Sequence, residues 1–233
     1  MTAEPREEAR RKDGAALSDA AIEALGGTPR QVHRGPVSPL RWLLPPALGR
    51  QISAFDQRAD AAFERIRGQR ALDRLFYSAS ALADFSLLWH VVGASRALRS
   101  RHEEESLRLA AALGMESLLI NMGVKSLFRR RRPVREEHER HQLRQPRSSS
   151  FPSGHATSGF MAATLLGKGR SPLNRLGWYG LAGVVAASRV HVNIHHASDV
   201  VGGALIGVGL GRLVAWIWPV AVRQKRSARP ATR

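Results

Sequence analysis

Three short clusters of residues in the second half of the chain combine cationic, imidazole and carboxylate side chains. The first consists of Lys125 and Arg132-Pro133, the second of Pro152-Ser153-Gly154-His155, and the third of Ser188-Arg189, His195 and Asp199. Each cluster stands at an end of an apolar stretch of sequence. The chemistry that each could perform follows from its side chains.

Lys125, Arg132 and Arg189 supply three cations at the ends of apolar segments. A charge in such a position is costly unless it is paired or faces water. Three converging cations would be stable around one dianion, and phosphate is the common biological dianion. The planar donors of Arg match phosphate oxygens well.

The second cluster places a Ser-Gly turn directly before an apolar stretch. Such a turn at the N-terminus of a helix presents free backbone N–H groups to an anion. Ser153 and Gly154 are therefore candidate phosphate-binding residues. His155 would stand beside the bound anion, where an imidazole can give a proton to a leaving oxygen.

His195 and Asp199 are four residues apart, which would place both side chains on one face of a helix. A carboxylate that holds one imidazole nitrogen fixes the tautomer and leaves the other nitrogen free to attack. The three clusters together predict phosphoryl transfer to His195, with His155 as the acid and the cations stabilising the transferred group.

Five apolar stretches must position these clusters, and we expect each to form a membrane helix. They are Leu75–Leu98, Leu107–Phe128, Ala156–Gly167, Leu176–Ser188 and Val200–Val222. The third and fourth are shorter than the ~20 residues of a free-standing span, so their ends are expected to lie in a polar cavity. The predicted fold is an all-α polytopic membrane bundle of about five spans.

The remaining chain divides by composition. Residues 1–36 are predicted to form a loosely ordered polar tail, residues 37–74 an interfacial segment with an amphipathic helix over 51–70, residues 75–222 the catalytic domain, and residues 223–233 a basic tail. Two polar loops, 129–151 and 191–199, are expected on the same side of the membrane. They carry most of the candidate site.

The formal net charge of +17 implies an anionic partner, and the absence of Cys excludes disulfides, zinc thiolate sites and cysteine nucleophiles. A nucleic-acid-binding protein would fit the charge. The polar tail, however, offers no aromatic side chains on which bases could stack, so we expect no nucleic-acid partner.

The three clusters resemble, at every fixed position, the signature of the type 2 phosphatidic acid phosphatase superfamily, which also includes vanadium-dependent haloperoxidases. The resemblance covers roughly residues 75–220. It implies a phosphohistidine on His195 that Asp199 orients, and a role for His155 in protonating the leaving group and then activating water. It also implies that Lys125, Arg132, Ser153, Gly154 and Arg189 hold the phosphate.

Membrane members of this superfamily act on lipid phosphates, including phosphatidic acid and polyprenyl phosphates or diphosphates, without a metal ion or other cofactor. The chain is therefore expected to hydrolyse a lipid phosphate as an integral protein of the bacterial plasma membrane. A soluble haloperoxidase and a catalytically silent lipid-binding bundle are the alternatives. The sequence leaves open the lipid, the oligomeric state and the side of the active site, because one additional span would reverse the orientation.

Several polar residues outside the signature are expected to have structural roles. Asp84 and His90, within the first apolar stretch, are expected to face the bundle interior, with a link from this pair to the active site as the alternative. Arg129, Arg130 and Arg131 are expected either to be solvated or to contact lipid headgroups. His191 and His196 suggest a polar loop more than a metal site.

Overall fold

A computed structural model describes residues 45–100, 102–133 and 148–220, and these residues form helices and no strand. The elements are α3 (Pro46–Glu64), α4 (Arg70–Leu82), η2 (Asp84–Ser86), α5 (Leu87–Ser100), α6 (Glu103–Leu118), the π-helical turn η3 (Leu119–Val124), α7 (Lys125–Leu127), α8 (Gly154–Gly167), α9 (Pro172–His191) and α10 (Ala197–Ile217). The all-α prediction is confirmed. The two predicted tails lie outside the described residues.

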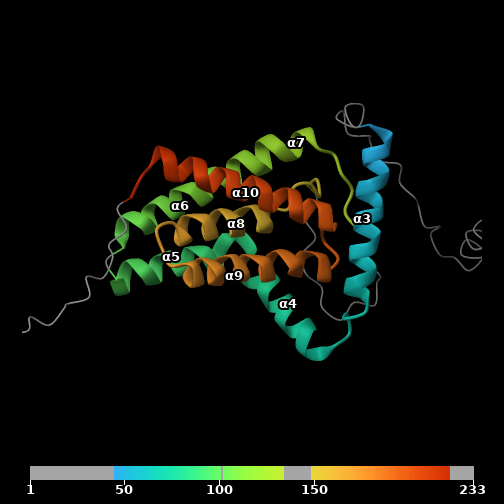
Figure 1. The fold of residues 1–233 in the computed structure, drawn as a ribbon, viewed down its shortest axis with the longest axis horizontal. Helices are drawn as coiled ribbons and strands as arrows, with labels where there is room; N and C mark the ends of the chain where they lie inside the picture. The colour runs from blue at the N-terminus through green and yellow to red at the C-terminus, as the bar shows by residue number, and fades with distance from the viewer. Residues whose placement is uncertain (1–44, 101, 134–147, 221–233) are drawn as a thin grey trace, which may run out of the picture. The chain divides into compact units, whose positions relative to one another are not determined.

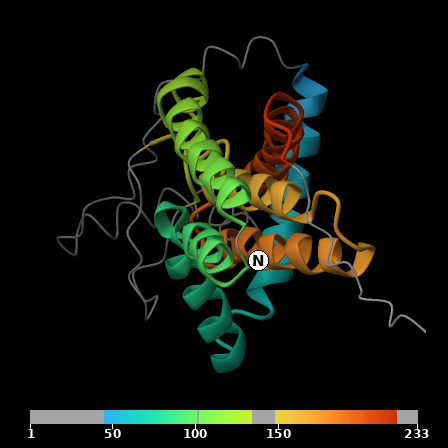
Figure 2. The same cartoon turned by 90° about the vertical axis from the view of Figure 1, so that its left-hand side faces the viewer.

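Helix α8 forms the centre of the bundle and packs against α6, α9 and α10 (Figures 1 and 2). Its sequence is short and rich in small apolar residues, and Met161, Ala162 and Leu165 are buried in the main hydrophobic core together with Leu113 of α6 and Trp89 of α5. Its 14 residues are about 21 Å long. Because α8 is shorter than a bilayer core, its N-terminus can lie within the bundle.

Helix α10 approaches α8 closely because it has glycine where the two helices touch. A Cβ atom at Gly203 would stand 2.6 Å from the carbonyl oxygen of Ser153, and one at Gly211 would stand 2.7 Å from Cβ of Thr164. At Gly207 it would overlap the carbonyl oxygen of Thr157. Gly203, Gly207 and Gly211 therefore form the surface of α10 that α8 contacts.

The first apolar stretch does not form the single helix that its composition suggested. Helices α4 and α5 meet at η2 with a bend of 64°, and Phe85 and Ser86 adopt left-handed backbone conformations there, with φ of 52° and 58°. Non-glycine residues rarely adopt this conformation, because Cβ crowds the backbone. The break places Asp84 beside the first turn of α8.

Within the part of the chain that the structure describes, two helices are long and apolar enough to cross a membrane, Glu103–Leu127 and Ala197–Ile217. A third span results if α4 and the following segment to Arg99 count as one broken span. This count is lower than the five predicted spans. The difference includes α8, whose length falls below the ~20 residues that a spanning helix needs.

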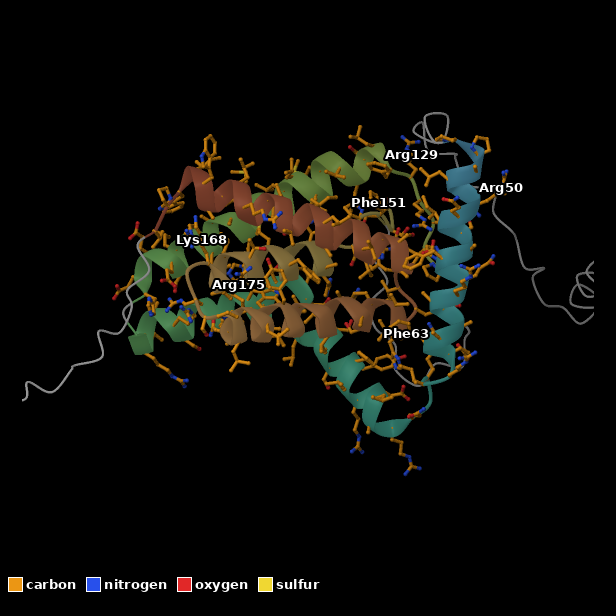
Figure 3. All side chains as sticks on the ribbon, in the orientation of Figure 1. Arg50, Phe63, Arg129, Phe151, Lys168 and Arg175 are labelled. Carbon is orange, nitrogen blue, oxygen red and sulfur yellow. The ribbon has the colours of Figure 1, made fainter. Side chains whose placement is uncertain are left out.

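The amphipathic helix predicted over 51–70 is present as α3, which begins earlier, with Pro46 in its first turn and at a position that suits proline. It crosses the ends of α9 and α10 (Figure 1). Phe63, labelled in Figure 3, packs edge-on against Phe76 and His191, with ring centroids 6.2 and 6.1 Å apart. Helix α3 therefore packs against its own domain.

The contact between α8 and α10 can be tested with two substitutions on α10. We expect Gly207→Ala to destabilise the protein by ~1–3 kcal/mol, because the added methyl overlaps the Thr157 backbone. Gly209→Ala is the control, since a Cβ there has no atom within 4 Å. Thermal unfolding in detergent should show a lower Tm for the first variant alone. Equal Tm values would contradict the close packing.

Candidate active site

A cavity of about 260 Å³ opens where η2, η3, α8 and the loop between α9 and α10 meet. Six of the eight predicted site residues line it: Lys125, Arg132, Gly154, His155, Arg189 and His195. The other two, Ser153 and Asp199, are buried. Ser153 directly precedes the lining residue Gly154, and Oδ2 of Asp199 lies 3.8 Å from Nδ1 of the lining residue His195. The three sequence clusters therefore converge on one site.

The three predicted cations reach the cavity from different elements. Nζ of Lys125 donates to Oδ1 of Asn121 at 2.9 Å and lies 3.8 Å from the place where a Cβ of Gly154 would stand. Arg189, buried near the end of α9, donates to the hydroxyl of Ser80 in α4.

Arg132 is held by backbone oxygens. It donates to the carbonyl groups of Ser148, Ser149 and Ile194 at 3.2, 3.2 and 3.1 Å. These partners are neutral, as is the Asn121 amide that holds Lys125. Two carboxylates act on these charges electrostatically: Glu116, which lines the same cavity, acts on Lys125, and Asp199 acts on Arg132. An anion in the cavity would meet both cations.

The N-terminus of α8 adds uncharged donors. Ser153 is the N-cap residue, with extended backbone angles, and its side chain makes no capping hydrogen bond. Its Oγ is buried and has no hydrogen-bond partner among the residues that the structure describes. A buried hydroxyl without a partner is costly, and the first N–H groups of a helix also lack an intrahelical acceptor. An oxyanion at this position would satisfy both.

His195 lies in the short loop between α9 and α10 and is 3 % exposed. Its Nε2 stands 3.0 Å from Nη1 of Arg132. A guanidinium group can only donate, so Nε2 must carry the lone pair and Nδ1 the proton. In this tautomer Nε2 is the nitrogen that could act as a nucleophile, once Arg132 releases its lone pair.

Asp199 lies behind this ring, but the geometric reason given by the sequence was wrong. His195 precedes α10, whereas Asp199 is its third residue, so the two do not share a helical face. Oδ2 of Asp199 accepts from the backbone N–H of His196 at 2.9 Å and lies 3.8 Å from Nδ1 of His195. The latter separation is an ion-pair distance and longer than a hydrogen bond. Oδ1 is 2.6 Å from Nη1 of Arg130.

The electrostatic environment keeps His195 uncharged. Burial, together with the positive charges of Arg132 and Arg189, lowers the pKa of His195 to about 3, although Asp199 acts in the opposite direction. The ring is therefore neutral at physiological pH. A neutral imidazole is the form that can attack phosphorus.

His155 faces the cavity from the first turn of α8, and its Nε2 lies 2.9 Å from Oδ1 of Asp84. Asp84 stands at the break between α4 and α5 and also lines the cavity. The sequence alternative that linked Asp84 to the active site is therefore the one observed. His90, expected in the bundle interior, is exposed.

The remaining polar residues have other partners. Arg130, expected to be solvated or at lipid headgroups, pairs with Asp199. His191 pairs with Asp73 at 2.9 Å, and Nε2 of His196 lies 3.2 Å from the carbonyl oxygen of Arg131. Within residues 45–100, 102–133 and 148–220, no three His, Asp or Glu side chains are grouped as metal ligands would be.

Sequence comparison identifies the family. The model of the PAP2 superfamily matches residues 105–223, about half of the chain. The chain belongs to the PAP2 superfamily. The match begins in α6 and includes all eight predicted site residues. α3 and Asp84 lie outside it.

Two curated PAP2 relatives are phosphatases, which confirms the predicted enzyme class. A decaprenylphosphoryl-5-phosphoribose phosphatase of Mycobacterium tuberculosis is 30 % identical over 129 residues, 54 % of this chain and 69 % of that protein. A lipid A 1-phosphatase of Porphyromonas gingivalis is 40 % identical over 73 residues, which are 30 % of this chain but 16 % of that protein.

Two crystal structures share the fold. LpxE of Aquifex aeolicus superposes with a TM-score of 0.55 at 24 % identity, covering 67 % of this chain and 93 % of that one. A transmembrane PAP2-type phosphatidylglycerolphosphate phosphatase of Bacillus subtilis gives 0.54 at 22 % identity, covering 89 % and 96 %. With the two spanning helices, this likeness supports an integral membrane protein.

The protonation state of His195 can be measured by NMR of histidine-labelled protein in detergent. We expect its ring signals, assigned with His195→Gln, to stay constant between about pH 5 and 8. The ring stays neutral over this range, because the pKa of His195 is lowered to about 3, far below the ordinary pKa of histidine. The substrate-free protein should be used, since a bound dianion would favour the charged ring. A titration midpoint near 6.5 would contradict the burial and charge argument.

The contact between Asp84 and His155 predicts a second effect. We expect Asp84→Asn to lower kcat by roughly tenfold or more, approaching the ~10²-fold or greater loss expected when a general acid is removed. Asp73→Asn is the matched control, because Asp73 pairs with a histidine at the same 2.9 Å, away from the cavity. Equal kcat values for the two folded variants would show that Asp84 does not act on His155.

Proposed function

We propose that this PAP2 protein hydrolyses a phosphate monoester or diphosphate of a lipid through a phosphohistidine intermediate on His195. The observation that carries the proposal is the Nε2 atom of His195. This nitrogen is the unprotonated one, because it accepts from Arg132. His195 itself is buried and lines a cavity that Lys125 and Arg189 also line.

In the first step, Nε2 of His195 attacks phosphorus and the bond from phosphorus to the leaving oxygen breaks. His155 gives its proton to that oxygen. Asp199 stabilises the charge that develops on the ring of His195 and keeps the proton on Nδ1. The product lipid leaves, and the phosphoryl group remains on Nε2.

In the second step, His155 takes a proton from a water molecule, whose oxygen attacks the phosphoryl group. The bond between phosphorus and Nε2 breaks, inorganic phosphate is released and both imidazoles return to their starting state. Lys125, Arg132 and Arg189, with the N–H groups and the hydroxyl at the start of α8, stabilise the phosphoryl oxygens in both transition states.

A lipid substrate is supported by the surroundings of the cavity. Phe85, which lines it, is 87 % exposed, and Leu118, Leu119 and Met122 of the neighbouring helix are also exposed. Such a group of apolar side chains suits acyl or prenyl chains. The lipid substrates named for the two curated relatives agree with this class. We place the protein in the bacterial plasma membrane.

The proposal predicts that phosphate release from a panel of lipid monophosphates and diphosphates in detergent persists in EDTA. It also predicts that His195→Ala abolishes release, because the substitution removes the proposed nucleophile. His90→Ala is the matched control, since His90 is exposed and makes no contact with the cavity. A second arm quenches turnover of ³²P-labelled substrate in alkali and looks for retained label.

Wild type and His90→Ala should release phosphate and retain alkali-stable label, and His195→Ala should do neither. Release that continues in His195→Ala would overturn the nucleophile assignment. Release that stops in EDTA and returns with a divalent cation would overturn the metal-independent mechanism. No release from any lipid would favour the silent lipid-binding bundle.

A further inference from the structure

Helix α3 buries one carboxylate beside the active site. Asp56 is 8 % exposed, whereas Asp60, one turn later on the same helix, has a side chain that is 57 % exposed. A buried carboxylate requires compensation by hydrogen bonds or an opposite charge. The partners of Asp56 therefore indicate why an otherwise amphipathic helix turns this residue inward.

Asp56 binds the start of α10. Its Oδ1 accepts from the backbone N–H of Ser198 at 2.8 Å, and its Oδ2 accepts from the hydroxyl of Ser198 at 2.9 Å. Ser198 directly precedes Asp199. The negative charge of Asp56 also interacts favourably with the positive end of the α10 helix dipole.

Asp56 also binds Arg130, which connects it to Asp199. Nη2 of Arg130 lies 2.5 Å from Oδ2 of Asp56, and Nη1 lies 2.6 Å from Oδ1 of Asp199 and 2.6 Å from the hydroxyl of Ser198. One guanidinium group thus bridges two carboxylates. Its planar donors fix the rotation of the Asp199 carboxylate, since Oδ1 is held by Arg130 while Oδ2 faces His195.

We infer that Asp56 is a positioning residue for the phosphatase reaction, which acts through Arg130 and Ser198 on Asp199 and thereby on His195. The inference rests on the proposed nucleophilic role of His195. Asp56 and Arg130 are absent from the three sequence clusters, and Asp56 lies outside the matched family region. Helix α3 is then part of the catalytic apparatus of this chain.

A merely structural role is the alternative, because α3 has a second attachment. Arg67, just beyond the helix, donates to the carbonyl oxygens of Val190 and His191, both at 3.0 Å, and pairs with Asp60 at 2.7 Å. This second attachment has no contact with Asp199. It supplies a control that weakens α3 docking without disturbing the bridge.

The test compares Asp56→Asn with Asp60→Asn in the full chain. An asparagine at position 56 keeps the shape and can still accept from Ser198, but it loses the charge that holds Arg130. We expect kcat to fall roughly 10–100-fold, the range found when an outer partner that orients an active-site group is removed, while KM stays near wild type. Asp60→Asn should keep the wild-type kcat per folded molecule.

Two readouts separate positioning from folding. In a double-mutant cycle, Asp56→Asn should add little to Arg130→Gln, because both break one bridge. The ¹⁵N ring spectrum of His195 should show the proton on Nδ1 in all three proteins, because Arg132 donates to Nε2 in each of them. The Nδ1 resonance should shift in Asp56→Asn alone, because the Asp199 carboxylate that faces Nδ1 loses its fixed orientation.

Unchanged kcat and an unchanged Nδ1 resonance of His195 in Asp56→Asn would overturn this inference alone, as would losses that add fully to those of Arg130→Gln. The resonance measurement needs no turnover. It therefore tests the bridge even if His195→Ala retains phosphatase activity, an outcome that would overturn the proposed function instead.

Discussion

The gathering of Lys125, Arg132 and Arg189 around one small cavity is the constraint to which the rest of the bundle responds. These three positive charges repel one another, and burial removes the water that would screen the repulsion. The fold provides oxygen partners from several elements, including the Asn121 amide and the Ser80 hydroxyl. In the proposed reaction, a bound phosphate relieves the repulsion, so binding and charge stabilisation have the same source.

The scaffold holds this arrangement by packing that allows little adjustment. α8 and α10 touch through glycine, so the start of α8 and the start of α10 are fixed relative to each other. The backbone N–H of Ser153 donates to the carbonyl oxygen of Asp199 at 3.1 Å, which joins the anion-binding turn to the carboxylate behind His195. A shift of either helix would move both parts of the site.

The sequence predicted the helices, the amphipathic segment and all residues of the signature, because each depends on local pattern or spacing. It did not predict the break at Phe85, since no proline or glycine marks it. It could not assign Asp56, Ser80 or Arg130 to the site. Their contacts join residues separated by 68 to 142 positions, and only the folded chain brings these residues together.

The break between α4 and α5 exposes Phe85 at the edge of the cavity. This apolar edge would place the site at the surface of the bilayer or micelle that contains the proposed substrate. The proposed lipid substrate would reach this edge by lateral diffusion, so turnover would depend on its mole fraction in the bilayer or micelle and not on its bulk concentration. Added detergent would then slow turnover at constant total lipid by surface dilution. A KM for this protein would then have to be expressed as a mole fraction of lipid in the bilayer or micelle.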